Sequence, residues 1–446
     1  VLVVYPIQSH ITLMLQLATI LHSKGYSITI VHPKFNSPNS SKHPKFTFIP
    51  ISDNLSQSNV SPSDLVNFIG MLSTLNKNCV TSFEQCVNQM MQKEEEDDRI
   101  TCIIYDSLMY FAQDVADSFK LPGISVRTSV AATLMVMAVF RRPDEQGYIS
   151  FIDYMPEDKT PVLQSLKLKN IFESMPQSLR DAMLEHRVAL TDSLKRSSAI
   201  IVNTMDFLEQ EILTNIQKLF SAPVITIGPF HKLAPTISST SIFQEDATCI
   251  SWLDKQVPKS VIYVSFGSMA SMNENELHES AWGLANREQP FLWVIRPGLV
   301  RGVDWLKLLP EGFQERVGER GCIVKWAPQK EVLAHVAVGG FWSHCGWNST
   351  LESICEGIPM LCRPFSGDQL MIVRYVCDVW KVGFELESES DRGKIERAVR
   401  RLMMDTEGED IRQRAMELKE KVDHCLRESG SSLECLNELT EKILSV

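Results

Sequence analysis

The sequence predicts an α/β protein made of two domains, each with a doubly wound parallel sheet. Short apolar runs with the length of buried strands alternate with segments of helical periodicity, which is typical of a parallel sheet covered by helices. This alternation stops over residues 231–248, which are rich in Ser, Thr and Pro, and then restarts. A chain of 446 residues is long enough for two such domains joined by a linker.

The first half opens on a β-α-β pattern. Residues 1–5 form an apolar run that ends at Pro6. Residues 11–24 then carry apolar side chains at helical spacing and stop at Gly25. Because open α/β sheets bind ligands beyond the carboxyl ends of their strands, we expect a cleft between two facing domains. Further strands are expected at residues 27–31, 101–105, 199–203, 261–265, 291–295, 322–325 and 338–342, and helices at 109–119 and from about 391 onward.

Charge and cysteine content exclude several classes of function. The net charge is −11, from 44 basic and 55 acidic side chains, so nucleic acids and anionic lipids are poor partners. No apolar stretch reaches the roughly 18 residues of a membrane span. Eleven cysteines without a Cys-x-x-Cys pair fit free thiols in the cytoplasm and no structural metal site. The chain begins at Val1 in a predicted strand and without Met, so we expect the natural start to lie upstream.

The densest group of polar and aromatic residues lies between Trp326 and Gln369. Here a predicted strand runs into the turn 343–346, and a helix begins near Asn348 and ends at Gly357. A helix N-terminus presents backbone N–H groups and the positive end of the helix dipole, and both favour an anion. The sequence therefore predicts a diphosphate site at this helix tip.

The side chains near the tip suit the rest of a nucleotide sugar. Ser349 and Thr350 add hydrogen-bond donors, and His344 lies at the mouth of the turn. Glu352 lies one turn along the helix and offers a carboxylate to paired ribose hydroxyls, while Trp326 offers a flat apolar face to a base. Each residue alone also has a structural interpretation, as core Trp, solvated Glu or helix N-cap. We take His335, on the short helix before the strand, as structural.

In its order of W-A-P-Q, H-C-G-W-N-S, E-S and D-Q, this segment closely resembles the 44-residue box of plant family-1 UDP-sugar glycosyltransferases. The resemblance extends more weakly over the whole chain. It implies the GT-B fold of two facing Rossmann-like domains and a monomer that uses UDP-glucose as co-substrate with no further cofactor. The domains it implies are an acceptor domain at 1–230, a linker at 231–248, a UDP-sugar domain at 249–429 and a C-terminal helix at 430–446 that packs back on the first domain.

The resemblance also assigns donor contacts. It implies that Trp326 stacks on uracil, that Glu352 holds the ribose, and that Asp368 and Gln369 bind sugar hydroxyls. Gln at the last box position resembles the glucose-preferring members. The diphosphate would be bound by His344, Asn348, Ser349 and the backbone of Trp347, with Thr128, Ser268, Ala327 and Gln329 completing the donor site.

A general base is predicted in the first half of the chain. His10 ends the predicted strand-loop 6–10, and Asp106 follows the strand 101–105. Parallel strands bring their carboxyl ends to one edge of a sheet, so a His–Asp contact is plausible, although His10 could also simply pack at the start of a helix. The resemblance implies that His10 takes the acceptor proton, that Asp106 stabilises the imidazolium, and that the anomeric centre inverts. No Asp-x-Asp triplet is present to bridge the diphosphate to a metal.

The acceptor site is the least specified region. Ser9 and Leu13 stand where the family usually has Gly and Pro, and Ser9 could cap the first helix. Ile372 and Val373 stand where Asn-Ala is common. An apolar acceptor, such as a plant specialised metabolite or hormone, is implied, and Met side chains suit an adaptable pocket. Candidate lining residues, most of which could equally be core, are Leu13, Met109, Val130, Met135, Met137, Met183, Phe365 and Ser366.

Three rival functions were weighed against this interpretation. A nicotinamide-dependent oxidoreductase needs a G-x-G-x-x-G turn after its first strand, and the turn here, PIQSHI, has no glycine. An α/β-hydrolase needs G-x-S-x-G, which does not occur. A UDP-sugar-binding protein with lost or weak transferase activity stays open because of Ser9 and Leu13.

Overall fold

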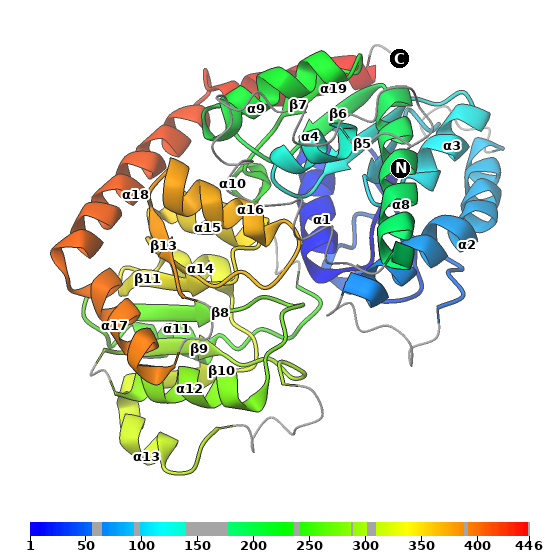
Figure 1. Cartoon of the computed structure of the whole chain (residues 1–446). Helices are drawn as coiled ribbons and strands as arrows, with labels where there is room; N and C mark the ends of the chain where they lie inside the picture. The colour runs from blue at the N-terminus through cyan, green and yellow to red at the C-terminus, as the bar shows by residue number, and fades with distance from the viewer. Residues whose placement is uncertain are drawn as a thin grey trace. The chain divides into compact units, whose positions relative to one another are not determined.

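The computed structural model describes residues 1–55, 65–92, 99–139, 177–235, 241–286, 289–300, 309–387 and 391–444. The chain divides into two compact units (Figure 1). The N-terminal unit comprises Val1–Ile242 and Cys425–Val446, and the C-terminal unit comprises Phe243–His424.

The described strands of the N-terminal unit form one parallel sheet in the order β3-β2-β1-β4-β5-β6-β7. Strand order reverses between β1 and β4, which is the switch point of a doubly wound sheet. The strands are β1 (Leu2–Val3), β2 (Thr29–Pro33), β3 (Thr47–Ile51), β4 (Ile103–Asp106), β5 (Gly123–Arg127), β6 (Ala199–Val202) and β7 (Val224–Thr226). The helices are α1 (Gln8–Ser23), α2 (Leu65–Met91), α3 (Phe111–Ser118), α4 (Ala132–Val139), α8 (Gln177–Arg196), α9 (Asp206–Leu219), α10 (Phe230–Leu233) and α19 (Ser431–Leu444).

The described strands of the C-terminal unit form a second parallel sheet in the order β10-β9-β8-β11-β12-β13, with its switch point between β8 and β11. The strands are β8 (Val261–Ser265), β9 (Phe291–Val294), β10 (Gly321–Val324), β11 (Val338–Ser343), β12 (Met360–Cys362) and β13 (Gly383–Glu385). The helices are α11 (Thr248–Leu253), α12 (Glu274–Ala285), α13 (Phe313–Val317), α14 (Gln329–Ala334), α15 (Trp347–Glu356), α16 (Gln369–Arg374), α17 (Arg392–Met403) and α18 (Thr406–Cys425). In Figure 1, α14 and α15 lie on one face of this sheet and α12 and α17 on the other.

Each unit has its own apolar core. Both faces of the sheets are covered, so central strands such as β4 and β11 are buried along their whole length. Helix α19 contributes Leu436 and Leu439 to the core of the N-terminal unit, although it lies at the far end of the sequence. The predicted class, two α/β domains with parallel sheets, is confirmed.

One element boundary matters for function. The first helix begins at Gln8, three residues before the predicted start, with Ile7 in an extended conformation as its N-cap residue. His10 therefore lies in the first turn of α1 and not in a loop after the strand. Ser9 does not cap this helix, because the cap has no side-chain hydrogen bond and Ser9 is already helical. The apolar periodicity begins only at Ile11, which is why the polar first turn was missed.

Two global features complete the description. All eleven cysteines lie in described residues and are free thiols. Among the helices that the structure describes, none is both long and apolar enough to cross a membrane.

Candidate active site

His10 and Asp106 meet at the switch point of the N-terminal sheet. Asp106 is the last residue of β4, and α1 follows β1, which pairs with β4 in the register Leu2↔Ile104. The Nδ1 atom of His10 lies 2.6 Å from Oδ2 of Asp106. The Asp106 side chain is fully buried, while that of His10 keeps 17% of its surface exposed. The sheet topology thus brings the predicted pair together and leaves the imidazole accessible.

The position of Asp106 is fixed by a second hydrogen bond. Its Oδ1 atom accepts the backbone N–H of Leu108 at 3.0 Å, so one oxygen serves the backbone and the other serves His10. A carboxylate at Nδ1 favours the tautomer with the proton on that nitrogen, which leaves the lone pair on Nε2. A group that approaches Nε2 therefore meets a base.

Two further residues contact His10 and were not predicted to do so. Thr128, after β5, was expected to face the donor, and its buried Oγ1 atom lies 3.1 Å from Nδ1 of His10. The Tyr5 ring, fully buried, packs 5.2 Å from the imidazole centroid to centroid. Burial raises the pKa of Tyr5, and the nearby Asp106 raises it further, so Tyr5 acts as a neutral wall.

The predicted strand, turn and helix of the donor box are present in the C-terminal unit. Strand β11 ends at Ser343, and α15 begins at Trp347 after Gly346, an extended N-cap residue without a side-chain bond. Residues 348–350 are therefore not an N-cap, and that alternative is wrong. The backbone N–H of Thr350 bonds to the Gly346 carbonyl at 2.9 Å. The N–H groups of a helix's first turn have no intrahelical partner and point out of its end, as an anion site requires.

His344 is held between two glycines. A Cβ atom at Gly267 would lie 2.5 Å from the His344 Nε2 atom, and one at Gly346 would lie 2.4 Å from it. Gly267 also has a φ of +67°, which favours glycine. The pKa of His344 is lowered to about 4, mainly by burial; the Ser265 backbone opposes this shift and the charge of Arg296 adds to it. His344 is therefore a neutral hydrogen-bonding group at pH 7.

Arg296 is a residue that the sequence did not reveal. It is buried, and its guanidinium donates to the carbonyls of Gly267 at 3.1 Å, Pro297 at 3.1 Å and Ala270. Burial lowers its pKa to about 10, so it remains a cation near neutral pH. It supports the turn after β8 that carries Ser268, which is half-buried. A lone Arg after a strand gives no sequence signal of this role.

A hydrogen-bond network orients Glu352. The Nε2 atom of Gln329 donates to Oε2 of Glu352 at 2.7 Å and to Oγ of Ser349 at 2.9 Å. The Oε1 atom of Gln329 accepts a hydrogen bond from the Tyr263 hydroxyl at 3.2 Å. Burial raises the pKa of Glu352, and the bond from Gln329 opposes that rise. Gln329 thus holds Glu352 and Ser349 on one side of α15.

The remaining donor candidates lie in the same unit. Trp326 is half-buried, with its ring 4.5 Å from that of Phe243, and Ala327 beside it is buried. Asp368 is the half-buried N-cap residue of α16 and makes no side-chain cap bond. The Oε1 atom of Gln369 accepts the backbone N–H groups of residues 365 and 366 at 2.8 and 3.4 Å. Its amide nitrogen is therefore the end available to a sugar oxygen.

The acceptor candidates divide into two groups. Leu13, Met109 and Val130 are fully buried, and Leu13 belongs to the core of the N-terminal unit. Met135 is also buried. The more accessible candidates are Met137 and Met183, both half-buried in the N-terminal unit, with half-buried Phe365 and exposed Ser366 in the C-terminal unit. For the first group the core interpretation is the one that the structure supports.

Comparison with known proteins identifies the family of this chain. The family described as UDP-glucoronosyl and UDP-glucosyl transferase matches residues 1–420. The chain belongs to this family. Its fold is the GT-B fold, and it is a UDP-glycosyltransferase of the plant type, as the box between Trp326 and Gln369 implied.

Three similar proteins illustrate the relationship. UDP-glycosyltransferase 76B1 of Arabidopsis thaliana is 45% identical over 443 residues, which are 99% of this glycosyltransferase and 97% of the relative. Flavonol 3-O-glucosyltransferase UGT76E12 of the same plant is 44% identical over 449 residues, covering 99% and 96% of the two chains. The structure of Phytolacca americana UGT2, complexed with UDP-2fluoro-glucose and pterostilbene, has a TM-score of 0.79 at 26% identity and covers 99% and 98%.

Proposed function

We propose that this glycosyltransferase transfers glucose from UDP-glucose to a hydroxyl group of a small apolar plant metabolite, with inversion and with His10 as general base. The observation that carries the proposal is the 2.6 Å contact between Nδ1 of His10 and the buried Asp106. A base of this kind needs a partner that orients it and balances the charge it acquires. Asp106 meets both needs because its second oxygen is anchored to the backbone of Leu108.

In the proposed reaction the proton moves from the acceptor hydroxyl to His10. Nε2 of His10 accepts the acceptor's hydroxyl proton as the oxygen forms its bond to the anomeric carbon, and the bond from that carbon to the UDP oxygen breaks. The imidazolium that results is stabilised by Asp106, and Thr128 helps to hold the ring. A single displacement of this kind inverts the anomeric configuration.

The leaving UDP carries negative charge, which we assign to the tip of α15. The first-turn N–H groups and dipole of this helix, the Ser268 turn and neutral His344 supply donors without a bound cation. Buried Arg296 adds a positive charge behind that turn. The absence of an Asp-x-Asp triplet from the sequence supports the same proposal. We therefore propose that transfer needs no metal and no cofactor beyond the donor.

Glucose and an apolar acceptor are supported by separate considerations. Gln369 offers its amide nitrogen to a sugar oxygen, because its Oε1 atom is already bonded to the backbone. One relative is named a flavonol 3-O-glucosyltransferase, and a structural neighbour holds UDP-2fluoro-glucose and pterostilbene. Half-buried Met137 and Met183 offer adaptable apolar surface.

The test is a donor–acceptor screen with mass detection. Purified protein is incubated with UDP-glucose, UDP-galactose or UDP-glucuronic acid and a panel of phenolic and terpenoid alcohols, and the anomeric configuration of the product is read by NMR. A β-glucoside formed in the presence of a chelator is the expected result. Binding of UDP-glucose without transfer to any acceptor would instead support the sugar-binding protein with lost activity.

A further inference from the structure

A pocket lined by apolar side chains together with several charged ones lies at the opposite edge of the C-terminal sheet from the proposed donor site. Its wall includes Lys259, which precedes β8, Val338, which begins β11, and Ile358, which precedes β12. In a parallel sheet these amino ends share the edge that lies away from the carboxyl ends. The pocket encloses about 130 Å³, whereas a single water needs only about 10–15 Å³ by the same kind of measure. It has room for a small ion and its hydration.

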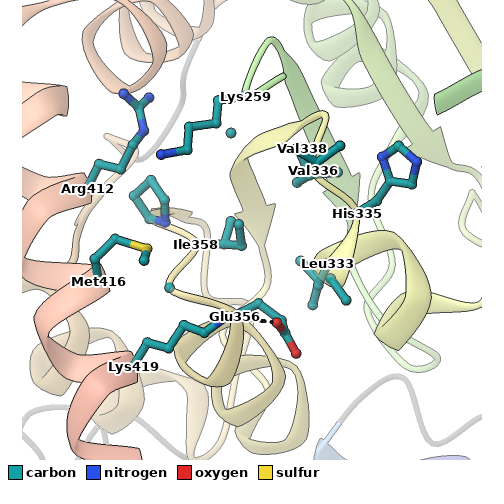
Figure 2. Close-up of a pocket in the computed structure, with 14 residues that line it drawn as sticks. Lys259, Leu333, His335, Val336, Val338, Glu356, Ile358, Arg412, Met416 and Lys419 are labelled. Carbon is teal, nitrogen blue, oxygen red and sulfur yellow. Dashed lines mark hydrogen bonds and ion pairs between the residues drawn. The ribbon is translucent and has the colours of Figure 1, made fainter. Parts of the chain in front are cut away.

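Helix α18 forms the other wall. Arg412, Met416 and Lys419 follow one another at spacings of four and three residues and so share one face of this helix. Figure 2 shows Lys259 and Arg412 extending toward one another on one side of the pocket, and Lys419 turning toward Glu356 on the other.

The charges of the pocket do not balance. Lys419 is paired with Glu356 at 3.3 Å. His335 is paired with Asp254 at 3.2 Å. Among the ion pairs of the described residues, none involves Lys259 or Arg412. Lys259 is exposed and Arg412 is half-buried. Two cations therefore lie on one side of the pocket without an acidic partner, and together they favour an anion.

The guanidinium of Arg412 has buried N–H groups that lack a hydrogen-bond acceptor in the part of the chain that the structure describes. Its Nε atom and one terminal nitrogen are buried, and no acceptor in the described residues lies within hydrogen-bonding distance of either. A buried charged donor without an acceptor is costly, because the hydration that it loses is not replaced. A guanidinium presents paired N–H groups that match the oxygens of a phosphate.

The backbone at Lys259 is also held in an uncommon conformation. Its φ is +57°, in the left-handed region that lysine rarely adopts. The Lys259 backbone N–H bonds to the Val336 carbonyl at 2.9 Å. Its own carbonyl packs so closely on Gly339 that a Cβ there would lie 2.1 Å from the oxygen. The wall is therefore rigidly built at the residue that brings the second charge.

From these observations we infer that the pocket between Lys259 and Arg412 binds a phosphate group, at a site separate from the donor site. The ligand is either inorganic phosphate or the terminal group of a small phosphomonoester. The phosphate accepts hydrogen bonds from the guanidinium of Arg412 and lies between the two cations, while the Lys419–Glu356 pair lies on the other side of the pocket.

The experiment is calorimetric titration of the full chain, saturated with UDP so that the donor site is occupied. Inorganic phosphate and glycerol phosphate are titrated in separate arms at fixed ionic strength, with chloride as the control anion. We expect one phosphate to bind per chain, and Arg412→Gln to weaken that binding about tenfold or more. Binding of both probes identifies a phosphate group, and binding of inorganic phosphate alone identifies the free ion.

Three variants separate binding from a structural role. Arg412→Gln removes a buried charge without an acceptor, so its melting temperature in chloride buffer should equal or exceed that of the wild type while its response to phosphate is lost. Lys259→Gln should weaken phosphate binding in the same direction. Lys421→Gln, at an exposed position of α18, removes one charge outside the pocket and should change nothing. Phosphate affinity equal in wild type, Arg412→Gln and Lys259→Gln, or no binding by the wild type, would overturn the inference.

Discussion

The two sheets of this glycosyltransferase share a strand order around their switch points, yet they place different chemistry there. At the first switch point, between β1 and β4, two titratable side chains meet, His10 and Asp106. At the second, between β8 and β11, the groups are backbone donors, glycines and the neutral His344. We propose that one fold has thus been adapted at the same topological position to move a proton in one unit and to hold an anion in the other.

The difference shows how each task constrains the residues around it. His10 keeps part of its surface exposed while its partner is buried, as the proposed base requires, since one of its nitrogens must stay accessible. Glycines flank His344, as the proposed diphosphate site requires, since the backbone must approach the ligand closely. Variants at the first site should therefore change rate, and variants at the second should change affinity for the donor.

The largest expected effect is on the base. His10→Ala should lower glucose transfer to ordinary alcohols by about 10²–10⁴-fold, because no base is then left at the reacting centre to remove the proton of the substrate hydroxyl. Affinity for UDP-glucose, measured by calorimetry, should stay within about twofold. Asp106→Asn should lower the rate in the same way but less. Undiminished transfer by His10→Ala would remove the catalytic assignment.

A matched pair of glycines tests the second site. Gly267→Ala puts a Cβ against the His344 ring and should weaken UDP-glucose binding about 10- to 100-fold, in line with the roughly 1–3 kcal/mol cost of overpacking. Gly312→Ala has a similar positive φ, +77°, but open space around its Cβ, so it shares the backbone strain alone. Equal donor affinity in the two variants would show that the position of His344 is unimportant.

The Gln329 network predicts a smaller loss of affinity. Gln329→Ala removes the donor that orients Glu352 and Ser349, and the pKa of Glu352 should rise further once that bond is gone. UDP-glucose should bind about tenfold more weakly, since a hydrogen bond to a charged group contributes about 1.5 kcal/mol. Gln413→Ala, exposed on α18, is the control. An unchanged dissociation constant for Gln329→Ala would remove Glu352 from the ribose site.

The neutral state of His344 predicts how donor binding responds to acid. His344 has a pKa lowered to about 4, so it stays neutral down to about pH 5 and UDP-glucose affinity should be flat between pH 5.5 and 8. Burial of neutral His344 also contributes stability that is present above pH 6.5 and is lost as pH falls toward 4. A donor affinity that changes between pH 5.5 and 8 would contradict the neutral state of His344.

The smallest effect is expected in sugar choice. Gln369→His replaces an amide donor whose orientation is set by the backbone of residues 365 and 366. The ratio of kcat/KM for UDP-glucose over UDP-galactose should fall a few-fold, about 1 kcal/mol or less, as expected for one hydrogen bond. Parallel assays with the two donors measure it. A constant ratio would show that Gln369 does not read the sugar.

Much of the architecture could be predicted from the sequence because it depends on periodicity. The predicted strand 261–265 coincides with β8, and the turn before α15 was placed within one residue. Parallel strands made a contact between His10 and Asp106 plausible, and the family resemblance supplied the assignment; the two residues meet because β1 and β4 are neighbours in the sheet. The position of His10 inside helix α1 was not predicted, because the first turn of α1 is polar and carries no apolar signal.

Side-chain partnerships were harder to predict for a physical reason. The bonds of Arg296 to the turn after β8, and of Gln329 to Glu352, join segments that approach only after the sheet and its helices have packed. The contact of Thr128 with His10 depends likewise on the ends of β5 and the start of α1. Local patterns report strands and helices, but these contacts are fixed by packing between them.

The central claim is that His10 removes the acceptor's proton while the second site only holds the donor. The most direct measurement compares wild type and His10→Ala across phenols of increasing acidity at one pH. The account predicts that the rate deficit of His10→Ala is largest for weakly acidic phenols and shrinks for phenols that are already ionised, since these need no base. A deficit that is the same for every phenol would contradict it.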